Sequence, residues 1–208
     1  MAEKEPEREG LVRLVQRAQD GDREGAHALY DLYGKPVYNF VFRLIGSTED
    51  AEDLTQETFL KAFNEIGRLR DPGQFKFWLY RIARNEVYQR IRRLRRRPEI
   101  SIDNEQSGYY DLLPTTARDA NPEKRLLRQE LEDHVRRALE AMPLKLRDVF
   151  VLGVIQKFSY DEVAKIVGRS LLSVKTDIYR ARLIAREVIG RYLEKSTHEM
   201  PGSRKRDS

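Results

Sequence analysis

A proline-containing, acidic stretch in the middle of the chain most constrains its fold, because it divides the sequence into two blocks. Residues 98–123 contain three prolines, a glycine and several Ser, Thr, Asp and Asn residues. They include six acidic side chains but only one arginine. These are turn and loop formers, and a structureless stretch of this length is uncommon inside a compact domain. We therefore expect a first domain at 11–97, a flexible acidic linker at 98–124 and a second domain at 125–193.

Both blocks show the periodicity of helices, and short alternating runs rich in β-branched residues are essentially absent. A first helix is expected over 22–45, with Gly34 and Pro36 favouring a kink. The segment Ser47-Thr48-Glu49-Asp50 is a variant capping box that opens a helix through about residue 66, and another helix starts near Phe75. The sequence predicts an all-α protein of two small helical domains.

Composition narrows the function classes. The chain has no cysteine and only three scattered histidines, so we expect no disulfide, no metal site and no cofactor. No phosphate loop or nucleophile–base arrangement is present, which argues against an enzyme and leaves no catalytic residue to name. The N-terminus has no signal-like apolar run and no stretch approaches a membrane span, so we expect a cytoplasmic protein without membrane insertion of its own.

The predicted helix at 50–66 has one apolar and one acidic side. A helical wheel places Phe59 and Ala62 on the apolar side, whereas Asp53 and Glu57 lie opposite, with Leu54 and Leu60 flanking them. An ordinary solvated face and a surface that docks on a basic partner both fit this pattern. The wheel does not choose between them.

The predicted helix from Phe75 combines aromatic and basic side chains. Residues 81–97 contain eight arginines and one acid, a concentration that repels itself unless an anion such as nucleic-acid phosphate lies nearby. Neighbouring aromatic rings add surfaces on which unpaired bases can stack. We expect Trp78 to face the core and Arg81, Arg84 and Tyr88 to face outward, where nucleic acid would bind.

The strongest local motif lies at 159–185. Ser159 and Glu162 form a capping box, Gly168 stands where a turn needs positive φ, and Ser170 can cap the next helix. On that helix Val174, Ile178, Ala181 and Ala185 share one side, and polar and basic residues share the other. This is the pattern of a helix-turn-helix with a recognition helix for DNA, in which Asp177 at the edge would repel phosphate.

These motifs occur in the order and spacing of extracytoplasmic-function (ECF) sigma factors of bacterial RNA polymerase. Asp50 to Phe59 resembles the family's helix that binds the polymerase clamp, and Phe77 to Asn85 resembles its promoter-melting and −10 segment. Leu139 to Pro143 and the helix-turn-helix resemble the domain that reads the −35 element. The resemblance covers about residues 11–193, nearly the whole chain.

The resemblance implies a sigma factor whose partners are core RNA polymerase (the clamp of the largest subunits and the flap), promoter DNA and an anti-sigma factor. It assigns polymerase binding to Asp53, Leu54, Gln56 and Glu57. It assigns −10 recognition and melting to Trp78, Tyr80, Arg81, Arg84, Asn85, Tyr88, Arg92, Arg93 and Arg96. It assigns −35 contacts to Ser170, Ser173, Lys175, Thr176, Tyr179 and Arg180.

The chain departs from the family at several DNA-facing positions. Gln89 stands where Asp or Asn is frequent, Leu172-Ser173 stands where Gly-Thr is common, and Asp177 stands where Arg is common. The sequence therefore does not name a promoter. Two other functions remain open: a helix-turn-helix regulator that works without polymerase, and an RNA-binding or adaptor protein that uses the arginine run alone. The regulator leaves the docking helix without a use, and the adaptor leaves the C-terminal motif unexplained.

Overall fold

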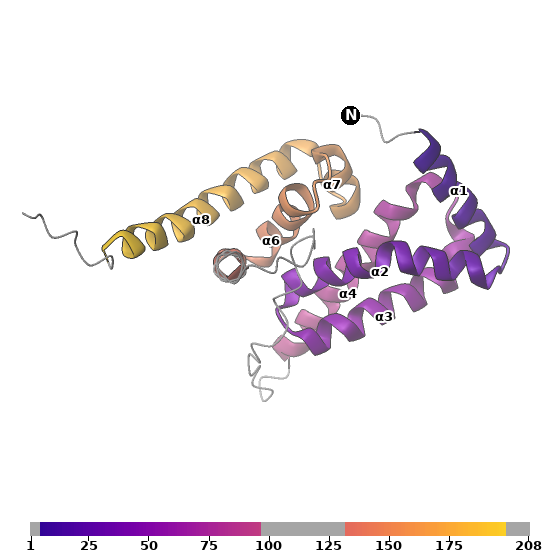
Figure 1. Cartoon of the computed structure of the whole chain (residues 1–208), viewed down its shortest axis with the longest axis horizontal. Helices are drawn as coiled ribbons and strands as arrows, with labels where there is room; N and C mark the ends of the chain where they lie inside the picture. Colours follow the sequence, from indigo (N-terminus) through magenta and orange to yellow (C-terminus); the bar gives the residue numbers. More distant parts are fainter. Residues whose placement is uncertain (1–4, 97–131, 199–208) are drawn as a thin grey trace, which may run out of the picture.

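The computed structural model describes residues 5–96 and 132–198, and every regular element in those ranges is helical (Figure 1). Helix α2 is the centre of the first domain and packs against α1, α3 and α4. The bounds are α1 Glu5–Gln19, α2 Arg23–Ile45, α3 Thr48–Glu65 and α4 Phe75–Arg96, with short 3₁₀ turns at Ile66–Arg68 and Pro72–Gln74. The expected all-α class is confirmed.

Local caps fix where the helices of the first domain begin. The Asp22 carboxylate accepts a hydrogen bond from the backbone N–H of Glu24 at 2.9 Å and so caps α2. The Ser47 hydroxyl accepts from the N–H of Asp50 at 3.2 Å, which is one half of the predicted capping box. Helix α2 runs from Arg23 to Ile45 with Pro36 inside it.

The second domain contains a helix at 132–140, α6 Leu144–Phe150, a π-helical turn at Val151–Ile155, α7 Tyr160–Val167 and α8 Leu171–His198. Helix α8 packs on both α6 and α7. The residues predicted to hold α8 down, Val174, Ile178, Ala181 and Ala185, are all buried. That prediction is confirmed.

The predicted cap of α7 and the predicted turn between α7 and α8 are both present. Ser159 Oγ accepts from the N–H of Glu162 at 3.3 Å, and the N–H of Ser159 donates to Glu162 Oε2 at 2.7 Å. Gly168 ends α7 in the left-handed region at φ 66°, and Ser170 Oγ accepts from the N–H of Ser173 at 3.3 Å. A helix-turn-helix follows from these local interactions, as the sequence predicts.

The two domains pack on each other through one continuous hydrophobic core. The Phe158 ring, which precedes α7, lies edge-on to Tyr80 of α4 at 4.9 Å between ring centroids, and it also contacts Phe77. Gln156 Nε2 donates to the Pro36 carbonyl at 3.2 Å, and Arg147 Nη1 donates to the Leu44 carbonyl at 2.8 Å. The chain segment expected to link the domains, 98–124, lies outside the described residues.

Replacing Gly168 with alanine is expected to destabilise the protein by roughly 1 kcal/mol, because an L-residue is strained in the left-handed region. An added Cβ meets no atom within 4 Å there, so only backbone strain changes. Gly67→Ala is the matched control, because Gly67 has equally open surroundings and no positive φ. Urea unfolding of both variants measures the difference; equal stabilities would contradict the prediction.

Candidate functional site

The outer side of α3 carries an exposed acidic and polar surface. Asp53, Gln56 and Glu57 are all exposed, and the side chain of Leu60 is 65% exposed beside them. At about 100° per residue these four positions lie within about 100° of one another on the helix. Helix α3 therefore presents one apolar side chain surrounded by carboxylates and an amide, here called the α3 face.

Leu54 does not belong to this surface. Its side chain is 3% exposed and lies in the core with Phe59 and Ala62. The sequence placed Leu54 beside the acidic face, where it was predicted to contact polymerase. The structure instead gives the role of exposed apolar side chain on α3 to Leu60.

The predicted −10 residues on α4 fall into three groups: those packed in or against the core, those exposed, and those that contact the second domain. Tyr80 is buried at 2% exposure, and Trp78 is half-buried against the core, beside Phe75. The exposed members of the set are Arg81, Asn85, Arg92, Arg93 and Arg96.

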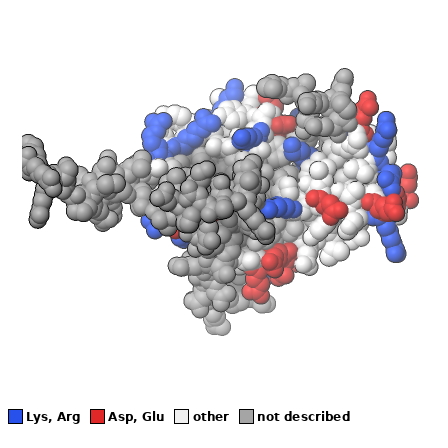
Figure 2. Space-filling model, viewed as in Figure 1, with Lys and Arg blue, Asp and Glu red and all other residues white. Residues whose placement is uncertain are grey.

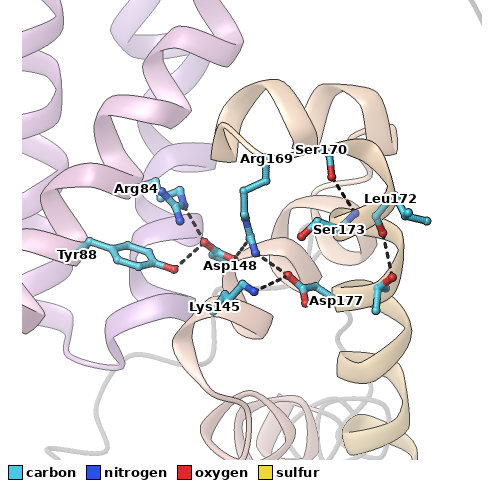
Figure 3. A network of polar contacts seen from close by, with 10 residues as sticks. Arg84, Tyr88, Lys145, Asp148, Arg169, Ser170, Leu172, Ser173 and Asp177 are labelled. Atoms are coloured by element: carbon cyan, nitrogen blue, oxygen red, sulfur yellow. Dashed lines mark hydrogen bonds and ion pairs between the residues drawn. The ribbon is translucent and has the colours of Figure 1, made fainter.

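Arg84 and Tyr88, which were predicted to face outward, instead reach the second domain. Arg84 Nε donates to Asp148 Oδ2 at 2.7 Å, and the Tyr88 hydroxyl donates to the same oxygen at 2.8 Å (Figure 3). The Arg84 guanidinium also stacks over the Tyr88 ring, 4.2 Å from its centroid. Arg84 and Tyr88 are therefore engaged by Asp148 of α6 in the present conformation.

Asp148 has no solvent exposure and is the most deeply buried acid in the described part of the chain. Burial raises the pKa of its carboxyl group, although Arg84, Tyr88 and Arg169 oppose that change. Burial and the nearby Asp148 carboxylate together raise the pKa of Tyr88 to about 12. Both groups are thus held in an environment that disfavours added negative charge.

A second set of ion pairs joins Asp148 to α8. Arg169 Nη2 lies 3.4 Å from Asp148 Oδ1, and Arg169 Nη1 donates to Asp177 Oδ2 at 2.5 Å (Figure 3). Lys145 Nζ lies 3.4 Å from the same Asp177 oxygen. One guanidinium therefore bridges two buried carboxylates.

The expected position of Asp177 at the edge of the DNA-facing surface is wrong. Asp177 is 3% exposed, and two cations neutralise it from within its own domain. Helical spacing carries the missed signal, since Asp177 follows Val174 by three residues and precedes Ala181 by four, which places it on the buried stripe. Asp148 lies four residues before the buried Leu152 and had the same signal.

The outward side of α8 is exposed and basic. Lys175, Thr176, Tyr179 and Arg180 are exposed as predicted, and Ser170 is exposed at the cap, whereas Ser173 is half-buried. In Figure 2 several blue side chains lie together over α8, whereas blue and red ones are mixed over the N-terminal helices. The exposed side of α8 thus combines cations with side chains able to touch base edges.

Two further observations limit the chemistry of residues 5–96 and 132–198. Their histidine, aspartate and glutamate side chains form no group of three arranged to hold a metal ion. Within the same residues no helix combines the length and apolar character that crossing a membrane requires.

Tyr88 should make stability depend on alkaline pH. Its pKa is about 12 in the folded protein, and about 10 is usual for an unfolded chain, so its contribution is complete below about pH 10. As the pH rises from about 10 towards 12, the unfolded chain loses the proton first and this contribution is lost. The wild type should therefore lose more stability over that range than Tyr88→Phe. Urea unfolding at stepped pH tests this, with Tyr179→Phe as the exposed control, and parallel curves for wild type and Tyr88→Phe would contradict it.

Asp177→Ala should destabilise the protein by roughly 2 kcal/mol, because the part-buried Arg169 loses a charge-assisted hydrogen bond and keeps only Asp148 as a partner. Were Asp177 a repulsive surface group, the same change would raise DNA affinity and leave stability unchanged. Asp161→Ala removes an exposed acid from α7 and should cost less than about 1 kcal/mol. Thermal unfolding and DNA titration together separate the two outcomes.

Comparison with known proteins relates the chain to a family. The Sigma-70 region 2 model matches residues 29–97, and the Sigma-70 region 4 model matches residues 133–183. The chain is 30% identical to the ECF RNA polymerase sigma factor SigW of Bacillus subtilis over 83% of this chain and 92% of the relative. It is 33% identical to the ECF RNA polymerase sigma-E factor of Escherichia coli over 81% of this chain and 88% of the relative.

Solved structures share the fold. CnrH, in complex with the cytosolic domain of CnrY, matches with a TM-score of 0.63 and 22% identity over 87% of this chain and 97% of that chain. The sigma factor RpoE of Bartonella quintana, in complex with the anti-sigma factor NepR, matches with a TM-score of 0.62 and 23% identity over 79% of this chain and 96% of that chain. The two sigma regions, in this order on one chain, with relatives that match most of its length, identify the protein as a member of the ECF sigma factor family, which directs promoter-specific initiation of transcription.

Proposed function

We propose that this sigma factor binds core RNA polymerase through the α3 face and reads promoters with two separate surfaces, one on α4 and one on α8. Residues 11–97 act as the polymerase-binding and −10 domain, and residues 125–193 act as the −35 domain. The protein acts in the cytoplasm as a non-enzymatic initiation factor. The exposed α3 face carries this proposal, because a DNA-binding regulator that works without polymerase has no use for it.

The α3 face suits a protein partner more than it suits DNA. Asp53 and Glu57 are exposed carboxylates that would repel phosphate, and Gln56 lies beside them. The exposed Leu60 supplies an apolar anchor within the same surface. A basic partner surface with an apolar pocket, provided by the polymerase clamp, fits this combination.

The proposed −10 surface on α4 begins with its exposed residues. Arg81, Asn85, Arg92, Arg93 and Arg96 can reach nucleic acid without any rearrangement. Arg84, Tyr88 and Tyr80 become available only when α4 separates from Asp148 and Phe158. We therefore infer that polymerase and promoter bind an opened form, in which phosphate replaces Asp148 as the anion beside Arg84.

The proposed −35 surface is the exposed side of the helix-turn-helix. Lys175 and Arg180 suit phosphate and base-edge contacts, and Thr176 and Tyr179 lie between them on α8. Ser170 and Ser173 sit at the N-terminus of α8, where backbone N–H groups favour a phosphate. This arrangement places the N-terminal part of α8 in the major groove.

An anti-sigma factor is the expected regulator. CnrH and the Bartonella RpoE were both solved as complexes, with CnrY and with the anti-sigma factor NepR. A comparable partner of this chain would cover the α3 face or hold the two domains together. The acidic segment at 98–124, outside the described residues, is proposed to thread the basic channel of polymerase by imitating the charge of nucleic acid.

Run-off transcription with purified core polymerase, on DNA from upstream of the protein's own gene, tests the proposal. The wild type should yield specific transcripts that core alone does not. Gln56→Ala/Glu57→Ala should lower affinity for core by tenfold or more, because it removes exposed charge and hydrogen-bonding groups from the interface centre. Binding to core is measured in the same samples.

The matched control is Glu9→Ala/Gln16→Ala, which removes the same two side-chain types from exposed positions on α1. It should transcribe like the wild type. DNA binding without core dependence and without transcripts would instead favour the regulator. Equal transcription by both double variants would remove the α3 face from the proposal and leave the sigma function intact.

A further inference from the structure

Exposed apolar side chains form a stripe along the outward side of α8. Leu172 is 75% exposed, Tyr179 is 63% exposed and Leu183 is 45% exposed. At 3.6 residues per turn, these three and Thr176 fall within an arc of about 60°. They are therefore one surface, and Leu172 stands at its N-terminal end, on the second residue of the helix.

The hydroxyl groups along this surface are partly engaged with the helix itself. Thr176 Oγ1 donates its only proton to the Leu172 carbonyl at 3.0 Å, which leaves a methyl group and an acceptor. Ser170 Oγ already accepts the N–H of Ser173 as the helix cap. The stripe thus presents more methyl and ring surface than free hydrogen-bond donors (Figure 3 shows Leu172 beside this cap).

Cations flank the stripe on both sides. Lys175 and Arg182 lie on one side of the arc and Arg180 lies on the other, and all three are exposed. A central apolar stripe with cations on either side matches a major groove, in which base edges lie between two phosphate backbones. In that groove the thymine 5-methyl group is the apolar feature that a side chain can read.

Resting on the proposed −35 role of α8, we propose that Leu172 is a specificity-determining residue that contacts the 5-methyl group of a thymine in the promoter. The N-terminal residues of a recognition helix are those that meet base edges. Leu172 is 75% exposed, so most of its side chain is free for that contact. Its partner is therefore one T·A base pair in the −35 element.

The test uses full-length protein bound to core polymerase. Duplexes are first selected by this complex from a pool randomised at the −35 element, and each thymine is then replaced singly by deoxyuracil, which removes only the methyl group. At one thymine the wild type should bind about fourfold more weakly, the loss expected for one buried methyl group. Leu172→Ala should bind the intact duplex more weakly by a similar factor. Its affinity should not change when uracil replaces that one thymine, whereas uracil at the other positions should act as in the wild type.

Leu32→Ala, at a similarly exposed leucine of α2, is the matched control and should keep the wild-type uracil pattern. An unchanged uracil pattern in Leu172→Ala would overturn the proposal. So would weaker binding to core with no change in DNA discrimination, because Leu172 would then contact protein. Lys175→Ala tests the −35 role of α8 separately from the thymine contact of Leu172. A general loss of DNA affinity would support the −35 role, whereas no loss would count against it.

Discussion

One buried carboxylate determines how the two domains fit against each other. Asp148 has no contact with solvent, and an unpaired charge in that position would cost far more than the protein's net stability allows. Its partners come from both sides: Arg84 and Tyr88 from the first domain and Arg169 from the second. Burial nevertheless raises the pKa of the carboxyl group, so its partners offset the cost of desolvation only in part. The closed arrangement is therefore held by aromatic packing around Phe158, and the network around Asp148 decides which partner surfaces fit against each other.

In this arrangement the same side chains cannot contact the second domain and promoter DNA at the same time. Arg84, Tyr88 and Tyr80 belong to the surface proposed for promoter DNA, yet they lie against the second domain here. The α3 face and the exposed side of α8 remain open at the same time. A partner that binds best when the two domains are packed together would prevent promoter melting without contacting DNA. Polymerase and promoter would instead favour separation of the two domains.

Local rules predicted the parts that local interactions determine. The capping box at Ser159, the positive φ of Gly168 and the buried stripe of α8 follow from residues close together in sequence. The contact between Arg84 and Asp148 joins residues 64 positions apart on different domains, and no periodicity of either helix indicates it. Leu54 and Asp177 were misplaced for other reasons. Leu54 lies near the border between the buried and exposed sides of its helix, and Asp177 has the spacing of the buried stripe but a charged side chain that suggested exposure. The proposed polymerase and DNA contacts stay predictions.

The Arg169 guanidinium, which pairs with both Asp148 and Asp177, has a consequence for how the two domains can separate. Asp177 takes both of its cations, Arg169 and Lys145, from its own domain, and Asp148 keeps Arg169 when Arg84 and Tyr88 leave. Separating the domains therefore breaks none of the ion pairs that orient α8. In the proposed opened form the second domain would present α8 in the same orientation as it has here. Lysine at position 169 would lose this property, because a single ammonium group lacks the planar fork that spans two carboxylates.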